Sequence, residues 1–207
     1  MAPGSIAAAG AFAAAARYLA ARARPAAAAA LCAVLAACAT PTPLSGPAGE
    51  DAFSRTGRFA VRVDHEGGKQ EAVQGGFAWR EAGGRLVLDL ANPLGATLAR
   101  VESDAGRSVL TRSDGSRTVA PDPDRLMAEV VGADIPVAGL RDWLRGRLPA
   151  DPPAQSVRRD AAGRPLSFVQ GGWQARLSRY DDRGPGLLQL ERSQAGQRIS
   201  VRLAVDG

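Results

Sequence analysis

The sequence contains few of the residues that catalytic and metal sites require. It has one histidine, His65, and two cysteines, Cys32 and Cys38, in 207 residues. A second histidine, a free cysteine beyond the N-terminal segment and a Gly-x-Ser-x-Gly turn are all missing, which argues against nucleophilic hydrolysis. The paired glycines at 75–76, 83–84 and 171–172 do not lead from a strand into a helix with a lysine, so they are not phosphate loops. We therefore predict a protein that is not an enzyme, with no catalytic residue, metal or cofactor.

Two acidic residues, Asp122 and Asp124, could form an acid/base pair or a cation site, but helix capping is sufficient to explain both. The charges are also evenly mixed. Of the 26 basic residues, three lie before residue 38, and none of the 21 acidic residues does. Residues 38–207 therefore have 23 basic and 21 acidic residues, a net charge of +2. Because no basic cluster or basic helix stands out, we predict no nucleic-acid partner.

The N-terminal segment has the pattern of a bacterial lipoprotein signal. Arginines precede an Ala-rich apolar run that ends in Leu35-Ala36-Ala37-Cys38. We predict that residues 1–37 are removed, that acyl chains such as palmitate are attached to Cys38, and that residues 38–52, with three prolines, form a flexible tether to a domain at residues 53–207. The alternative is an ordinary secretory signal cleaved near Ala37. No second apolar stretch approaches the roughly 20 residues that span a bilayer, so attachment would depend on lipid alone.

The first half of the domain alternates apolar and polar residues with a period of two, which predicts strands with one dry face. Phe59, Val61 and Val63 form the first series, and Leu86, Leu88 and Leu90 a later one. Gly75-Gly76, between two strand-like stretches, suggests a bulge or sharp bend. Short strands continue to about residue 120, separated by polar turns, as in a meander that curls toward a barrel.

The period becomes helical after Pro121 and returns to two after Pro153. Asp122 and Pro123 can begin a first helix that Gly132 ends. Pro136 begins a second, with an apolar stripe through Val137, Leu140, Trp143 and Leu144. Strand patterns then follow at 155–160, 166–170, 173–180, 187–192 and 199–205. We predict a mainly β fold: a curved antiparallel sheet of about 10 or 11 strands, with two or three short helices covering its concave face.

These residues resemble the LolB family of outer-membrane lipoprotein receptors over nearly the whole domain. The motifs that carry the resemblance are the lipidated Cys38, Gly57-Arg58-Phe59-Ala60, Phe77-Ala78-Trp79, Asn92-Pro93-Leu94-Gly95, the stretch from Gly132 to Val137 with Leu140, Trp143, Leu144 and Gly146, and Gln170-Gly171-Gly172-Trp173. The resemblance implies a half-open antiparallel β-barrel covered by the helices, with a hydrophobic cavity for the acyl chains of other lipoproteins. It also implies insertion of these lipoproteins into the inner leaflet of the outer membrane.

The implied partners are a LolA-like periplasmic carrier, acylated lipoproteins as cargo, and outer-membrane phospholipid; transfer between pockets needs only a monomer. The implied location is the periplasmic face of the outer membrane. Bacteria that sort lipoproteins by the residue after the cysteine retain those with Asp at that position in the inner membrane. This sequence has Ala39 there, which fits the outer membrane. Two alternatives remain: a structural or assembly lipoprotein that binds protein partners, and a soluble LolA-like carrier, which would not need Cys38.

Two sets of residues are candidates for these roles. Leu94 lies with Pro93 and Gly95 in a short turn where a polar side chain is usual. The resemblance implies a membrane-contacting loop there, whereas Leu94 could instead fold back over the end of the barrel. We expect the dry faces to line or support the acyl-chain cavity, although each of these residues could simply fill a core: Phe59, Val61, Phe77, Trp79, Leu86, Leu88, Leu90, Leu126, Met127, Leu140 and Trp143.

Overall fold

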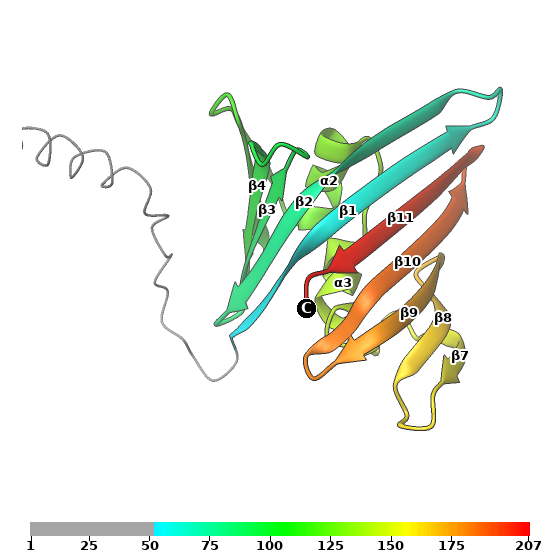
Figure 1. Cartoon of the computed structure of the whole chain (residues 1–207). Coiled ribbons are helices and arrows are strands. Elements are labelled where there is room, and N and C mark those ends of the chain that lie inside the picture. The colour runs from blue at the N-terminus through cyan, green and yellow to red at the C-terminus, as the bar shows by residue number, and fades with distance from the viewer. Residues whose placement is uncertain (1–51) are drawn as a thin grey trace, which may run out of the picture. The chain divides into compact units, whose positions relative to one another are not determined.

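The computed structural model describes residues 52–207, which form one antiparallel sheet of eleven strands and two helices (Figure 1). The elements in chain order are β1 (Phe53–His65), β2 (Gln70–Ala82), β3 (Arg85–Ala91), β4 (Thr97–Asp104), β5 (Arg107–Arg112), β6 (Arg117–Ala120), α2 (Pro123–Val131), α3 (Val137–Trp143), β7 (Gln155–Arg159), β8 (Pro165–Gln170), β9 (Trp173–Asp181), β10 (Gly184–Gln194) and β11 (Gln197–Val205). The predicted mainly β fold, with 10 or 11 strands and two or three helices, is confirmed.

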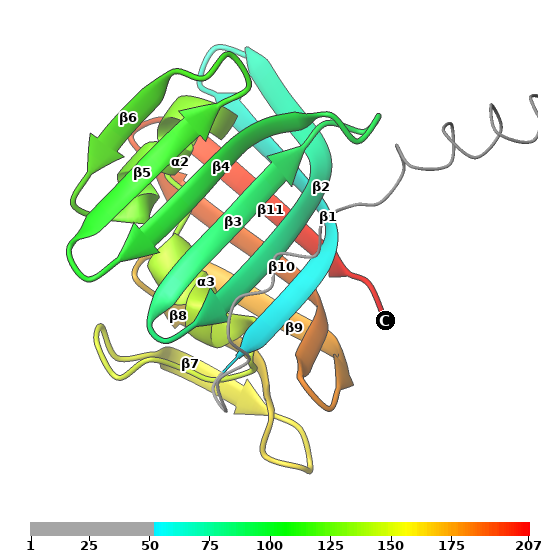
Figure 2. The same ribbon diagram turned by 90° about the vertical axis from the view of Figure 1, so that its left-hand side faces the viewer.

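The sheet does not close, and its ends are not the ends of the chain. The strand order is β6-β5-β4-β3-β2-β1-β11-β10-β9-β8-β7. β11 pairs with β1 on one side and β10 on the other, so the C-terminal strand lies at the centre of the sheet. The free edges are β6 and β7, the two strands that flank the helical insert (Figure 2).

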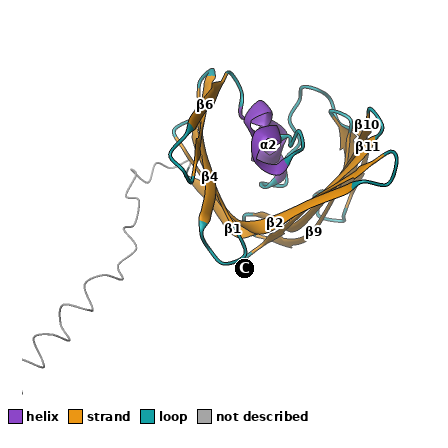
Figure 3. Ribbon diagram, turned by 90° about the horizontal axis from the view of Figure 1, so that it is seen from above, coloured by secondary structure: helices purple, strands orange, loops and turns teal. Residues whose placement is uncertain are grey.

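The sheet curls around both helices, which lie in its concave side (Figure 3). On β1, every second residue from Arg55 to Val63 is buried, and on β2 the buried positions include Phe77 and Trp79. Because alternate side chains point to opposite faces of a strand, these residues share the concave face. The opposite face of β1 is exposed at Arg58, Ala60 and Arg62. The apolar core therefore lies between the sheet and the helices.

The glycines of β2 have a different purpose from the predicted bulge. Pairing between β1 and β2 continues without interruption through Gly75 and Gly76, so no bulge occurs there. A register shift occurs instead between β3 and β4, at Leu90 and Ala91. A Cβ atom on Gly75 would lie 1.9 Å from the backbone oxygen of Ala91. Only glycine permits so close an approach of two backbones. The prediction identified the residue but not the reason for it.

Both predicted helices are present, and their ends match the sequence signals. The Asp122 carboxylate accepts a hydrogen bond from the Arg125 backbone N–H at 3.1 Å, and Pro123 occupies the first turn. Gly132 ends α2 in the left-handed region with φ +73°, where a side chain would be strained. Pro136 precedes α3, as expected. The insert is thus short and sharply delimited at both ends.

Candidate functional site

A small apolar hollow separates the concave face of the sheet from the helical insert. Its volume is about 40 Å³. Fourteen residues from the strands and from both helices line it, all of them aliphatic, aromatic or methionine: Phe59, Val61, Phe77, Trp79, Leu88, Leu90, Met127, Val131, Ile135, Val137, Leu140, Leu144, Val201 and Leu203. The hollow is therefore suited to hydrocarbon and to little else.

Eight of the eleven residues proposed for the cavity line this hollow: Phe59, Val61, Phe77, Trp79, Leu88, Leu90, Met127 and Leu140. Leu86, Leu126 and Trp143 are equally buried but pack elsewhere in the core. Six lining residues were not proposed: Val131, Ile135, Val137, Leu144, Val201 and Leu203. The alternation of Val201 with Leu203 and the apolar stripe of α3 were visible signals for four of them. Whether acyl chains enter here stays a prediction.

α3 is attached to the sheet by buried hydrogen bonds. The Trp143 indole Nε1–H donates to Gln170 Oε1 at 2.8 Å, across 27 residues of chain. Gln170 Nε2 donates in turn to the carbonyl oxygens of Pro149 and Pro152, at 2.8 and 2.7 Å. Gln170 is 3% exposed. One amide thus joins α3, the segment that follows it and β8, and it gives the buried Trp143 indole N–H its partner.

A charged cluster holds the C-terminal end of α3 to the first two strands. Glu81, on β2, lies 3.0 Å from Arg141 Nε and 2.9 Å from Arg145 Nη1. The Arg145 guanidinium lies over the ring of Phe53, 4.0 Å from its centroid, in cation–π contact. Phe53 is the first residue of β1. The strand that would follow the predicted tether is therefore in contact with the turn that follows α3.

Asp124 connects the two helices. Its carboxylate accepts a hydrogen bond from the Ala138 backbone N–H at 2.9 Å, at the start of α3. Sequence reasoning assigned both aspartates to capping, and Asp122 does cap its own helix, but Asp124 caps the next one. Burial raises the pKa of the Asp124 carboxyl above its ordinary value, although the hydrogen bond from Ala138 opposes the shift. This hydrogen bond links the first turn of α2 to the start of α3.

α2 is held differently. Its buried residues, Leu126, Met127 and Val131, pack toward β4, β5 and β6. Its polar connection to the sheet is Glu129, which pairs with Arg112 on β5 and accepts a hydrogen bond from Thr118 Oγ1 on β6 at 3.3 Å. These partners are partly exposed: 42% of the Glu129 side chain and 32% of the Arg112 side chain are accessible to solvent.

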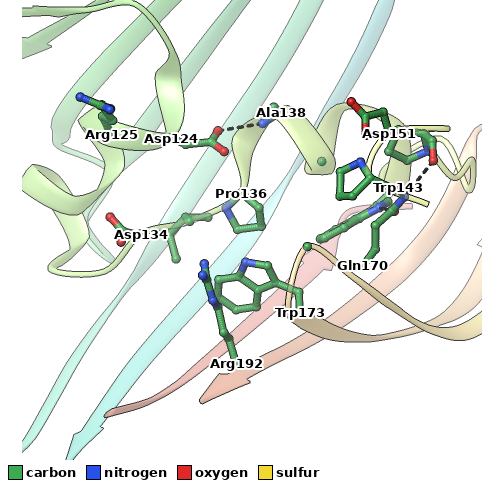
Figure 4. A pocket seen from close by; sticks show the side chains of 15 residues that line it. Asp124, Arg125, Asp134, Pro136, Ala138, Trp143, Asp151, Gln170, Trp173 and Arg192 are labelled. Atoms are coloured by element: carbon green, nitrogen blue, oxygen red, sulfur yellow. Dashed lines mark hydrogen bonds between the residues drawn. The ribbon is translucent and has the colours of Figure 1, made fainter. Parts of the chain in front are cut away.

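A second, larger groove opens beside α3, with a volume of about 520 Å³ (Figure 4). Trp143, Pro136 and Trp173 give it apolar walls, and Asp124, Asp134 and Asp151 lie around it. Arg192 lies over the Trp173 ring, 5.8 Å from its centroid. Ile135 lines both the groove and the hollow, so the short connection between the helices separates the two.

Leu94 is the most exposed large apolar residue of the described chain, with 94% of its surface accessible. It lies in the β3–β4 turn, which projects from the sheet in Figure 2. The Asn92 side chain shapes this turn by accepting hydrogen bonds from the backbone N–H groups of Leu94 and Ala96, at 2.9 and 3.0 Å. Gly95 supplies the positive φ of +86°. Leu94 does not fold back over the barrel end.

The remaining candidate residues form no metal site within residues 52–207. No group of histidine, cysteine, aspartate and glutamate in this part of the chain is arranged to hold a metal. His65 lies at the end of β1, and its Nε2 is 3.7 Å from Glu71. No helix among the described residues has the length and apolar character to cross a membrane. Cys38, the residue with the clearest sequence signal, lies outside the described residues.

A half-open barrel with an apolar interior beneath a two-helix insert defines a class of proteins that can enclose an apolar ligand. Within that class, a family model described as "Outer membrane lipoprotein LolB" matches residues 51–207. The chain belongs to the LolB family, as the sequence motifs indicated.

Two LolB proteins support the same assignment by sequence identity. The outer-membrane lipoprotein LolB of Bordetella petrii is 59% identical over 165 residues, which cover 80% of this chain and 82% of that protein. The LolB of Cupriavidus necator is 39% identical over 154 residues, 73% of this chain and 77% of that protein. Among solved structures, a LolA superfamily protein from Nitrosomonas europaea matches with a TM-score of 0.41 and 10% identity, covering 73% of this chain and 84% of that one.

Proposed function

We propose that this protein receives lipoproteins from a soluble periplasmic carrier, holds their acyl chains between the sheet and the helices, and inserts them into the inner leaflet of the outer membrane. The observation that carries the proposal is the wholly apolar hollow beneath α2 and α3 in a chain of the LolB family. The role is binding and transfer, without chemical change in the cargo. A single copy of the chain is sufficient for it.

The cost of moving lipid through water explains why such a receptor needs a hollow. Exposing an acyl chain costs about 0.8 kcal/mol per CH₂ group, so ten methylenes cost roughly 8 kcal/mol. An acylated protein must therefore pass directly from one apolar pocket to another. The curved sheet and its helices offer such a pocket, because every side chain lining the hollow is apolar.

The hollow must widen when it is used. Its volume of about 40 Å³ is well below the roughly 300–1,000 Å³ of ordinary ligand pockets. The helices would move away from the sheet as the acyl chains enter, and the chains would then cover the apolar surfaces of Met127 and Leu140 that this motion uncovers. The flexible side chain of Met127 suits a wall that repacks around different chains.

The proposed function requires the protein to be held at the membrane. We infer that residues 1–37 are removed, that Cys38 is acylated and anchors the chain, and that residues 38–52 tether the domain at residues 53–207 to the membrane. The lipoprotein signal pattern and the names of the relatives, outer-membrane lipoproteins, support this placement. The tether would allow the domain to reach both a carrier and the bilayer.

The β3–β4 turn is the proposed contact with the bilayer. Leu94 projects into solvent between Pro93 and Gly95, and burying a leucine side chain in the acyl region contributes roughly 1.5–3 kcal/mol. That is enough for repeated transient contact and too little for anchoring. Leu94 would therefore bring the loaded hollow to the membrane surface without holding it there.

A transfer assay with two substitutions tests both parts of the proposal. The purified full-length protein is mixed with a LolA-like carrier loaded with a lipoprotein, and transfer to the receptor and then to liposomes is measured. Leu140→Glu places a charge in the hollow and should abolish uptake, whereas the volume-conserving Leu140→Met should retain it. Leu94→Glu should retain uptake and block delivery, whereas Ala96→Glu, two residues away in the same turn, should still deliver.

Two outcomes would contradict the proposal. A folded Leu140→Glu protein that still takes lipoprotein from the carrier would show that the hollow is not the acyl-chain site. Normal delivery by Leu94→Glu would remove the role of the loop. Mass spectrometry of the N-terminal peptide tests the anchor separately, since an unmodified Cys38 would exclude lipid attachment.

A further inference from the structure

A row of arginines crosses the outer face of the sheet, the convex side that lies away from the helices in Figure 3. Residues directly opposite each other on neighbouring strands share a face. The paired residues of this row, from β7 through β8, β9, β10 and β11 to β1, are Arg158, Ser167, Arg176, Gln189, Arg202 and Ala60. Its three arginines are on alternate strands and thus lie about 9–10 Å apart.

Two further arginines flank this row on β1. Arg58 and Arg62 are each two residues from Ala60, so their side chains point to the same outer face. All the arginines concerned are exposed. We call these five residues the arginine face: Arg58, Arg62, Arg158, Arg176 and Arg202.

Acidic side chains neutralise only part of this charge. Arg62 Nε lies 2.8 Å from Asp64 Oδ1, and Arg176 Nη1 lies 3.7 Å from Glu191 Oε1. The other three arginines form no ion pair with any residue in the described part of the chain. Five guanidinium groups and two carboxylates therefore leave three positive charges in excess.

Part of the arginine face is hollowed into a groove of about 310 Å³. Arg158 and Arg176 both line it, with Ser167 between them in the row, and Glu191 lines it beside Arg176. A guanidinium group binds phosphate through two parallel N–H groups, and a serine hydroxyl can also donate. The groove therefore offers several hydrogen-bond donors to a phosphate group.

The arginine face continues to the β3–β4 turn, the proposed contact with the bilayer. Arg58 is opposite Gly76 on β2, and Gly76 is opposite Ala91, the last residue of β3 before the turn. Gly76 has no side chain, so the outer face is low between Arg58 and the turn. A bilayer that takes Leu94 into its acyl region therefore presents its headgroups to the nearby arginines.

We propose that the arginine face binds the headgroups of anionic phospholipids and holds the domain with its helices turned away from the bilayer. This inference rests on the proposed function, which tethers the domain to a membrane, and it adds the orientation in which the domain receives cargo. With the outer face against the lipid, the helical insert and the hollow beneath it face the periplasm, where a loaded carrier arrives. Exposed charges attract weakly and are screened by salt, so the domain can leave this orientation to deliver its cargo.

Energy transfer between the domain and the bilayer measures this orientation. The full-length lipoprotein is placed in vesicles of phosphatidylcholine alone, or of phosphatidylcholine mixed with anionic phosphatidylglycerol, which contain an acceptor dye on a lipid headgroup. The donor dye is attached at Ala60→Cys, within the arginine face, or at Ala138→Cys, which is exposed on α3.

On the anionic vesicles we expect stronger transfer from position 60 than from position 138. The difference should vanish on neutral vesicles, and also at about 1 M salt, where the Debye length falls to about 3 Å. The lifetimes of the donor dye resolve the bound and the free orientation, and their amplitudes give the ratio of the two.

Two arginine substitutions test the residues themselves. Arg202→Gln removes an unpaired charge from the row and should lower the ratio of bound to free orientation about fivefold on anionic vesicles. Adding Arg158→Gln should lower it by a similar factor again. Arg117→Gln is the matched control, because Arg117 is exposed on the edge strand β6 and also forms no ion pair within residues 52–207. It removes the same charge from the chain and should leave the ratio unchanged.

The outcomes separate this inference from the function on which it rests. Equal transfer from positions 60 and 138 on anionic vesicles would overturn the proposed orientation while leaving uptake and delivery of lipoproteins intact. Equal losses in Arg202→Gln and Arg117→Gln would show that only net charge matters, and would overturn the arginine face. If Arg202→Gln keeps the orientation but slows uptake from the carrier, the face binds an acidic protein surface and the assignment to lipid is wrong. A chain that does not stay on either kind of vesicle would contradict the lipid anchor of the proposed function itself.

Discussion

The two helices cover the same face of the sheet but are held to it by different forces. α3 has a buried amide network through Gln170 and a cluster of two arginines on Glu81. α2 has an apolar stripe and one partly exposed ion pair at Glu129. Buried hydrogen-bonded groups are costly to separate, whereas exposed ion pairs contribute at most about 1 kcal/mol. The comparison indicates that α3 is held to the sheet more firmly than α2, so we expect α2 to move first when the hollow widens.

The largest effect should come from breaking the attachment of α3. Gln170→Leu removes the acceptor of the buried Trp143 indole and the donor to two partly buried proline carbonyls, and leaves the indole N–H unpaired. We expect the free energy of unfolding to fall by about 1–3 kcal/mol, as measured by urea denaturation. Gln189→Leu, on the exposed face of β10, is the control and should change stability by less than about 0.5 kcal/mol. Equal losses in the two variants would mean that the amide network contributes nothing specific.

A smaller change in stability, with a larger effect on rate, is expected from α2. Glu129→Gln weakens the pairing with Arg112 and should cost at most about 1 kcal/mol, because the partners are partly exposed. Uptake of a fluorescent fatty acid, followed by stopped flow, should become faster, since less holds α2 to β5 and β6. Faster uptake in Gln170→Leu than in Glu129→Gln would reverse the comparison and make α3 the moving helix.

The smallest effect concerns the link between the helices. Burial raises the folded-state pKa of Asp124 above its ordinary value of 3.8, so the charged carboxylate is disfavoured in the fold. The stabilisation linked to its protonation is fully present below pH 3.8 and is lost as the pH rises through the folded pKa. Asp124→Asn can still accept from Ala138 N–H without a charge, and should equal or slightly exceed the wild type in stability at pH 7.

This advantage should shrink as the pH falls and the wild-type carboxyl takes up its proton. Urea denaturation of both proteins between pH 7 and pH 4 measures the difference. A variant that is clearly less stable than the wild type at pH 7 would show that the charge of Asp124 is needed to hold α3 in place.

Most of the fold could be predicted because its determinants are local. Alternation with a period of two marked the strands, and Asp122, Pro123 and Gly132 marked both ends of α2. The position of the β11 strand depended on pairing between segments far apart in the chain, which no local pattern contains. The close approach of Gly75 to Ala91 is of the same kind, and for that reason the sequence suggested a bulge where the backbone only needed space.

The site was harder to predict than the fold. Periodicity indicates which face of a strand or helix is dry, but not how deep a residue lies, so Leu86 and Leu126 could not be told apart from the residues that line the hollow. The exposure of Leu94 was visible as an apolar residue within a turn. Arg55 pairs with Asp181, 126 residues away along the chain, and Trp143 with Gln170, 27 residues away. Contacts of that kind arise only from the complete fold.

The position of the helical insert has a mechanical consequence. Residues 121–154 join β6 to β7, the two strands that have only one neighbour in the sheet. A displacement of this segment therefore breaks no interstrand hydrogen bond, and the eleven strands can keep their register while the enclosed volume changes. The sheet and the segment that can move thus belong to separate stretches of the chain. If the hollow holds acyl chains, as proposed, it could admit chains of different length without partial unfolding of the sheet.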